Sequence, residues 1–207
     1  MKVEMLENNS SYMRFKLSGS DYSTANALRR MLINSVDCFA IDRVTFYENN
    51  SVMFDEYIAH RVGMVPIKTP KGHDEKDEVL FSLEAEGPKT VYSKDIESKD
   101  KEVKVANEDI PIIKLGVNQK IKLDGKAVIG RGMKSSKFQP CVATYKQIDD
   151  NNYDFYIESF GQMPPAEILK RAVSIINSEL KEIAKEVRSY YACIYIKIIR
   201  MPANQSA

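Results

Sequence analysis

Residues 21–36 read DYSTANALRRMLINSV, and this stretch decides the fold more than any other part of the 207-residue chain. Asp21 follows a glycine-containing break and can cap a helix N-terminus through its carboxylate. Beyond it, Ala25, Leu28 and Leu32 recur at the spacing of one helical face. The stretch therefore predicts an amphipathic helix with an apolar stripe that must be covered.

A second amphipathic helix is predicted in the C-terminal part of the chain. Pro164 and Pro165 open it, because proline is tolerated in the first turn of a helix. Its apolar positions run from Ile168 to Val187 at helical spacing. Residues 192–198 then place apolar side chains at every second position, which favours a final strand over a continued helix.

The N-terminal part of the chain also contains strands and one short helix. Residues 2–17 alternate on both sides of a polar turn, which predicts a β-hairpin. Residues 40–47 predict a further strand. Residues 55–63 predict a short helix that Asp55 caps and Gly63 ends.

The middle of the chain reads as a series of short strands between residues 79 and 160. The clearest turn signals are Asp124-Gly125 and the polar run at 149–152. This order of elements predicts an α+β protein with a β-rich insertion.

The predicted α+β fold has a discontinuous domain in which two helices pack on a small antiparallel sheet. Residues 1–46 and 157–207 form this domain. Residues 47–156 form the inserted β-rich domain.

The composition is that of an ordinary globular protein and disfavours several function classes. Hydrophobic residues make up 43% and charged residues 29%, while the formal net charge is only +1. A nearly neutral chain lacks the field that attracts nucleic acid, and no apolar run approaches the roughly 20 residues of a membrane span. Cys38, Cys141 and Cys193 are odd in number and form no CxxC pair, so we expect a reducing, cytoplasmic setting.

The wide apolar stripes of the two predicted helices allow two interpretations. They can pack within the core of one chain, or they can form an interface with a partner, because obligate heterodimers resemble a divided core. The candidate interface positions are Ala25, Leu28, Leu32, Leu169, Val173, Ile176 and Leu180.

Two basic features admit both a binding role and a structural one. Arg29 and Arg30 either form a solvated helix face or dock on an acidic or carbonyl-rich surface, which a guanidinium can orient. The segment GRGMKSSKFQP at 130–140 suggests phosphate or RNA contact, or else an ordered loop at a sheet edge. It lacks the glycine spacing of a nucleotide-binding P-loop.

No set of residues forms a recognisable catalytic or metal site in the sequence. Glu56 and His60 lie one helical turn apart, but two ligands do not make a metal site. A stand-alone metal enzyme and an independent RNA-binding module are therefore the rival interpretations. The low net charge and the lack of a base-stacking aromatic motif argue against the RNA-binding module.

Several sequence blocks occur together in a characteristic order. They are NALRR at 26–30, AIDRV at 40–44, ENNSV at 48–52, DEYIAHRVGMVPI at 55–67 and KSSKFQP at 134–140. In this order they resemble the alpha-like assembly subunit of multisubunit DNA-directed RNA polymerases, in its archaeal, D-type form. The resemblance implies a scaffold without catalytic residues, whose terminal segments form a dimerisation domain and pair with a small L-type subunit.

The same resemblance implies further partners and no cofactor. The inserted domain would face the second-largest catalytic subunit and the small zinc-binding subunits, with DNA contacted only through the complex and with Mg and Zn held elsewhere. Arg29 and Arg30 match positions that face the large subunits, and Lys134 and Lys137 match a basic loop that we also assign to a large-subunit contact. A short strand–turn–strand at 145–159 replaces the cysteine-rich domain of longer relatives, so no iron–sulfur cluster is expected.

Overall fold

The computed structural model describes the backbone of residues 1–74 and 76–199, and the side chains of 1–74 and 76–188. Contacts within the chain divide it into two units, Met1–Ala172 and Val173–Ala207. Antiparallel sheets with few helices make this an α+β protein, as predicted.

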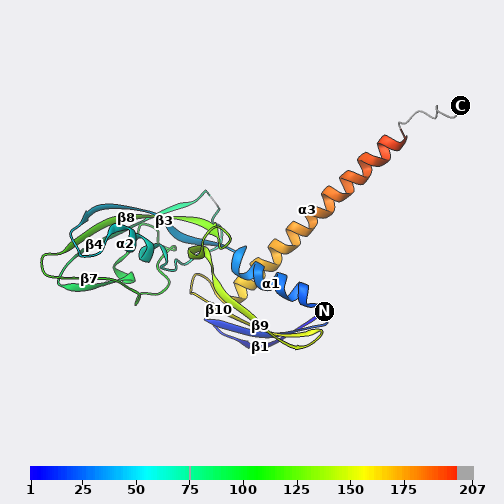
Figure 1. Ribbon diagram of the computed structural model, residues 1–207, viewed down its shortest axis with the longest axis horizontal. Helices are drawn as coiled ribbons and strands as arrows, with labels where there is room; N and C mark the ends of the chain where they lie inside the picture. The colour runs from blue at the N-terminus through cyan, green and yellow to red at the C-terminus, as the bar shows by residue number, and fades with distance from the viewer. Residues whose placement is uncertain (75, 200–207) are drawn as a thin grey trace. The chain divides into compact units, whose positions relative to one another are not determined.

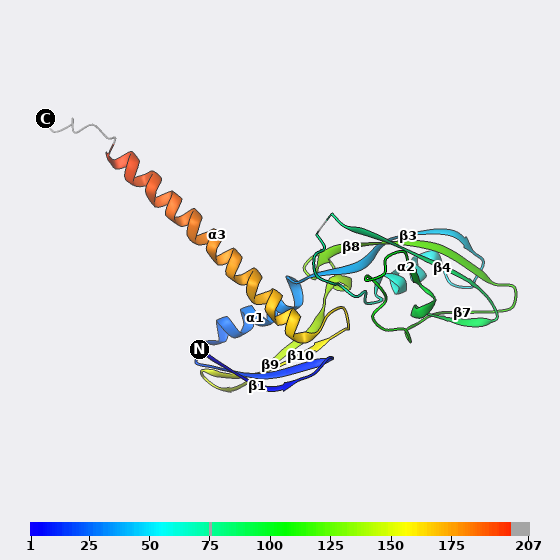
Figure 2. The same cartoon turned by 180° about the vertical axis from the view of Figure 1, so that it is seen from behind.

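One antiparallel sheet of the first unit brings together segments from both ends of that unit. Its strands follow the spatial order β1-β2-β10-β9, and helix α1, Tyr22–Asn34, lies against it (Figure 1, and from behind in Figure 2). The predicted N-terminal hairpin and the predicted turn at 149–152 are both confirmed. The strands are β1 Lys2–Asn8, β2 Tyr12–Ser18, β9 Cys141–Asp149 and β10 Asn152–Ser159.

Helix α1 is fixed to this sheet by its cap and by its apolar stripe. The Asp21 carboxylate accepts the backbone N–H of Thr24 at 2.9 Å, which confirms the predicted N-cap. Ala25 and Leu32 are fully buried in the core between helix and sheet. The helix ends at Asn34, two residues earlier than the apolar pattern predicts.

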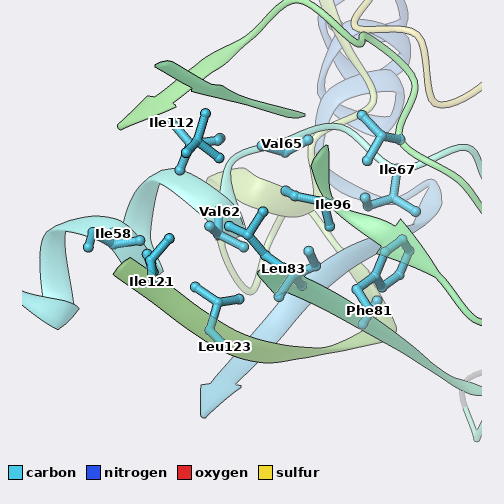
Figure 3. Packing of buried hydrophobic residues seen from close by; sticks show 14 of the residues in the cluster. Ile58, Val62, Val65, Ile67, Phe81, Leu83, Ile96, Ile112, Ile121 and Leu123 are labelled. Atoms are coloured by element: carbon cyan, nitrogen blue, oxygen red, sulfur yellow. The ribbon is translucent and has the colours of Figure 1, made fainter. Parts of the chain in front are cut away.

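A second antiparallel sheet holds the other core of this unit, and a short helix packs on it. Ile58 and Val62 of α2 lie over Leu83 and Leu123, which project from neighbouring strands (Figure 3). The sheet order is β3-β8-β4-β6, beside a two-stranded sheet of β5 and β7. The elements are β3 Asp37–Asn49, α2 Asp55–Gly63, β4 Glu78–Glu86, β5 Lys89–Tyr92, η1 Ser93–Asp95, β6 Glu97–Ser98, β7 Pro111–Leu115, β8 Lys120–Arg131 and η2 Ser136–Phe138.

The predicted turn at Asp124-Gly125 is wrong, because both residues lie inside the long strand β8. Gly125 pairs with Val44 on one side and with Phe81 on the other. A Cβ atom at Gly125 would lie 3.1 Å from Ile41 Cγ2. The glycine therefore makes room for a core side chain, which a turn signal cannot distinguish from a chain reversal.

Helix α2 has the predicted bounds but not the predicted cap. Phe54 occupies the N-cap position and makes no side-chain capping hydrogen bond. Asp55 is instead the first helical residue, and its carboxylate accepts a hydrogen bond from the Asn49 amide at 2.6 Å. Its charge in the first turn remains favourable to the helix dipole.

Helix α3 spans Pro165–Ile199, so the predicted strand at 192–198 is wrong. No glycine or proline interrupts the chain between Pro165 and Pro202. Extending an existing helix avoids the cost of nucleation, and this overrides a short alternating pattern. Residues 200–207 lie outside the described part of the chain.

The predicted division into a domain of residues 1–46 and 157–207 and an inserted domain of residues 47–156 remains a prediction. The sheet pairing does show to which sheet residues 141–159 belong. Strands β9 and β10 cover residues 141–159 and pair with the N-terminal hairpin through β2. Phe155 stacks on Phe15 with ring centroids 5.0 Å apart. The strand–turn–strand therefore belongs to the same sheet as the chain start.

Candidate protein interface

The most prominent apolar surface in the second unit is a seam along α3. Five apolar residues recur in alternating steps of three and four, which is the spacing of a coiled-coil seam. Four of them are exposed by 42–60% of their area, and Ile176 is half-buried. An apolar stripe this regular and this exposed is typical of a protein-binding surface. The seam consists of Val173, Ile176, Leu180, Ile183 and Val187.

The predicted interface positions on α1 are less exposed than the seam residues of α3. Ala25 and Leu32 are 0% exposed and pack in the core of their own chain, so the folded chain does not offer them to a partner. Leu28 of α1 and Leu169 of α3 are half-buried against the same core. The assignment of Ala25 and Leu32 to an interface is therefore corrected, because the sheet already covers them.

Two seam residues were not among the predicted interface positions. Ile183 and Val187 are 60% and 48% exposed and extend the seam beyond Leu180. A heptad reading of the helix would have included them, because they follow Leu180 by three and seven residues. The exposed seam thus extends beyond the predicted interface positions, within the stripe that the sequence predicts.

The two predicted docking arginines are not equivalent. The Arg29 guanidinium donates to the Asn26 side-chain oxygen at 3.0 and 3.2 Å and is half-buried. Arg30 is exposed, and within the described residues no hydrogen bond or ion pair engages it. Arg30 is thus the more accessible of the two guanidinium groups.

The two predicted docking lysines also differ. Lys137 forms an ion pair with Asp42 at 2.6 Å, and the hydrogen bond from Lys137 lowers the pKa of the Asp42 carboxyl. Lys134 is exposed. Both ammonium groups lie over the ring of the buried Phe138, at 5.7 Å for Lys134 and 5.4 Å for Lys137. Lys137 therefore helps to hold its own loop, and Lys134 remains accessible.

The glycines of the basic segment serve packing. A Cβ atom at Gly130 would lie 2.8 Å from the Phe138 ring, and one at Gly132 would collide with the Ile33 carbonyl oxygen of α1. The Met133 backbone N–H donates to the Asn34 carbonyl at 3.0 Å. The segment is therefore a loop anchored on α1, which favours the structural interpretation over a phosphate site.

A second exposed apolar surface, which the sequence did not indicate, lies where the chain enters α2. Val52, Phe54 and Tyr57 are 86%, 71% and 64% exposed. The rings of Phe54 and Tyr57 lie 6.4 Å apart. Aromatic side chains with this exposure are enriched in protein interfaces.

The rival metal site finds no support among the described residues. Glu56 and His60 are both exposed, and no group of three His, Cys, Asp or Glu side chains gathers in the described part of the chain. Cys38 and Cys141 are buried and unbridged, and burial raises the pKa of each thiol to about 12. This burial indicates a packing role for both thiols, whereas the Cys193 side chain lies outside the described residues.

The helices of the described chain also bear on membrane insertion. None of them, including the 35-residue α3, carries an apolar stretch long enough to cross a bilayer.

The sequence of the chain is similar to those of known RNA polymerase subunits. Residues 44–142 match the model of the RNA polymerase Rpb3/RpoA insert domain. The chain is 46% identical over 165 residues to the DNA-directed RNA polymerase subunit Rpo3 of Methanocaldococcus jannaschii, covering 80% of this chain and 85% of that protein. It is 37% identical over 198 residues to Rpo3 of Pyrococcus horikoshii, covering 92% and 76%. It is 28% identical to Rpo3 of Archaeoglobus fulgidus, covering 89% and 97%.

Proposed function

The chain belongs to the Rpo3 family of DNA-directed RNA polymerase subunits, and on that premise we propose that it is a non-catalytic scaffold on which the polymerase assembles. It pairs with a small alpha-like subunit and then receives the large catalytic subunits. We equate the Rpo3 family with the D-type archaeal subunit, and its partner with the L-type subunit. The complex works in the cytoplasm, and the chain meets DNA only through it.

The observation that carries the pairing step is the α3 seam. Leu180 and Ile183 are 58% and 60% exposed at its centre. Covering them with a helix of matching seam removes apolar area from water, which is the main driving force of obligate association. Between Ser174 and Arg188, most residues outside the seam are charged or polar, which favours contact through the seam.

The docking step rests on exposed basic groups of the first unit. Arg30 and Lys134 are accessible, whereas Arg29 and Lys137 are engaged within the chain. We assign Arg30 and Lys134 to contacts with the second-largest subunit, with the small zinc-binding subunits nearby. The chain itself needs no cofactor in this role, since structural Zn and catalytic Mg belong to other subunits and scaffolding requires no iron–sulfur cluster.

Isolation of the native assembly tests this proposal. The tagged chain is purified from its own cells, and the co-purifying chains are identified by mass spectrometry. We expect one small alpha-like subunit and both large polymerase subunits. Recovery of the chain alone, monodisperse and stable, would contradict the scaffold role.

The alternative of a stand-alone RNA-binding module is not favoured. Its carrier would be the 130–140 loop, where Lys137 is paired with Asp42 and the glycines make room for Phe138 and α1. Binding of the isolated chain to single-stranded RNA can be measured across salt concentrations, because direct phosphate contacts give a steep salt dependence. We expect no such dependence.

A further inference from the structure

The two flanks of the α3 seam differ in charge. The heptad register that starts with Val173 at position a puts all five seam residues at positions a and d. The flanking g positions are then Glu179 and Glu186, and the flanking e positions are Asn177 and Ala184. One flank is therefore acidic and the other uncharged. Residues at e and g set partner choice in a helix pair, so these flanks bear on which helix the seam accepts.

Neither flanking glutamate is engaged by its own chain. Glu179 and Glu186 are exposed, and among the described residues no ion pair or side-chain hydrogen bond involves either carboxylate. The cations of the same stretch, Lys181, Lys185 and Arg188, occupy the outer heptad positions b and f. Both carboxylates are thus available to cations of another chain.

A second copy of the chain fits this seam poorly. In an antiparallel pair of identical helices, g positions face g positions, so glutamates of the two copies would oppose each other. In a parallel pair, g positions face e positions, so Glu179 would face the uncharged Ala184. Like charges across an interface are unfavourable, and an uncharged neighbour offers no compensation. Neither arrangement supplies Glu179 with a cation.

We propose that the acidic flank selects the partner: the seam accepts a helix of the small alpha-like subunit whose own seam is bordered by lysine or arginine where it meets Glu179 and Glu186. This inference rests on the proposed scaffold function and adds the charge that the partner helix must carry. Burial of the apolar seam supplies most of the affinity. The two glutamates discriminate between that helix and a second copy of this chain.

Charge reversal on α3 tests the acidic flank, with a matched control on the same helix. Glu179→Lys and Glu186→Lys each reverse one flanking charge, and Glu182→Lys makes the same change at the outer position c. All three glutamates are exposed, so all three variants should fold as the wild type does. Calorimetry measures binding of each full-length variant to the small alpha-like subunit at low salt. We expect each flank variant to bind at least about threefold more weakly, both changes together about tenfold more weakly, and Glu182→Lys within about twofold of wild type.

Salt separates this charge effect from a structural one. At about 1 M salt the Debye length is only about 3 Å, so exposed charges interact weakly. The difference between the flank variants and Glu182→Lys should therefore nearly vanish there. A difference that persisted at high salt would contradict selection by charge.

The wild-type chain alone tests the exclusion of a second copy. In sedimentation equilibrium at low salt, we expect its self-association to be at least about tenfold weaker than its binding to the small alpha-like subunit. Self-association of equal strength would overturn the inference, as would equal binding by the flank variants and Glu182→Lys; in both cases the scaffold function would stand. Failure of the wild-type chain to bind the small alpha-like subunit would overturn both.

Discussion

Helices α1 and α3 have the same kind of apolar stripe in the sequence and use it differently in the structure. In α1, Ala25 and Leu32 are fully buried against the sheet of their own chain. In α3, Ile168 and Ala172 are buried in the same core, whereas most of the stripe between Val173 and Val187 is exposed and Ile176 is half-buried. A single helix thus begins in the core and continues with an exposed apolar stripe.

The difference shows that periodicity identifies an apolar face but not what covers it. Both helices satisfy the same spacing rule, yet Leu32 of α1 is buried and Leu180 of α3 is 58% exposed. We therefore expect equal substitutions on the two helices to have unequal effects on the isolated chain.

The largest contrast is expected between Leu32→Ala and Leu180→Ala. Leu32 is 0% exposed, so its truncation should leave a cavity and lower the free energy of unfolding by roughly 2–5 kcal/mol. Leu180 is 58% exposed, so its truncation should change that free energy by less than about 0.5 kcal/mol. Chemical denaturation of the isolated chain measures the free energy of unfolding of both variants. Equal losses would contradict the difference in burial between the two helices.

A smaller loss is expected for Gly132→Ala, which tests how α1 is held from its C-terminal end. The new Cβ would collide with the Ile33 carbonyl oxygen, a backbone atom that cannot move aside alone. We expect a loss of about 1–3 kcal/mol in thermal or chemical unfolding. Gly116→Ala is the control, because its Cβ would meet only the flexible Gln119 side chain at 3.3 Å, and a comparable loss there would refute the packing explanation.

A still smaller effect is expected for Asp42→Asn, which removes the ion pair between η2 and strand β3. Both side chains remain partly exposed to solvent, so the contribution of the pair should be about 1 kcal/mol or less. Because Lys137 lowers the Asp42 pKa in the folded chain, the contribution is present above the usual value of 3.8 and is lost as the pH falls below it. The stability difference between wild type and variant should therefore vanish in acid; a difference that grew there would contradict the pairing.

The smallest expected signal comes from the thiols beneath α1. Cys141 donates from its sulfur to the Leu32 carbonyl at 3.5 Å, and burial raises the pKa of Cys38 and Cys141 to about 12. In a Cys193→Ser background, both thiols should resist a disulfide reagent at about pH 8 until the chain unfolds. Rapid labelling in the native chain would mean that α1 leaves the sheet readily.

Much of the fold was predictable because its local signals agree with its packing. The Asp21 cap, the N-terminal hairpin and the turn at 149–152 each depend on residues close in sequence. The misassigned Asp124-Gly125 turn depends on which side chain packs against the glycine. The misassigned strand at 192–198 depends on how far the preceding helix propagates. Local patterns contain neither kind of information.

The candidate interface was predictable only in part for the same reason. The spacing of α3 pointed to Val173, Ile176 and Leu180, which are at least partly exposed. The same spacing also pointed to Ala25 and Leu32, which the sheet of their own chain buries. The strands of this sheet lie elsewhere in the sequence, so the helix sequence alone does not reveal the burial.

The most direct test of the central claim is formation of the heterodimer with Leu180→Asp and with Lys185→Asp. The two positions lie on opposite faces of α3, and both are exposed, so both variants should fold as the wild type does. A charge placed in a desolvated seam is costly, so Leu180→Asp should weaken binding to the co-expressed small alpha-like subunit by at least about 100-fold. Lys185→Asp should bind within a few-fold of wild type in size-exclusion chromatography and calorimetry. Equal binding by both variants would contradict the claim that the α3 seam is the pairing surface.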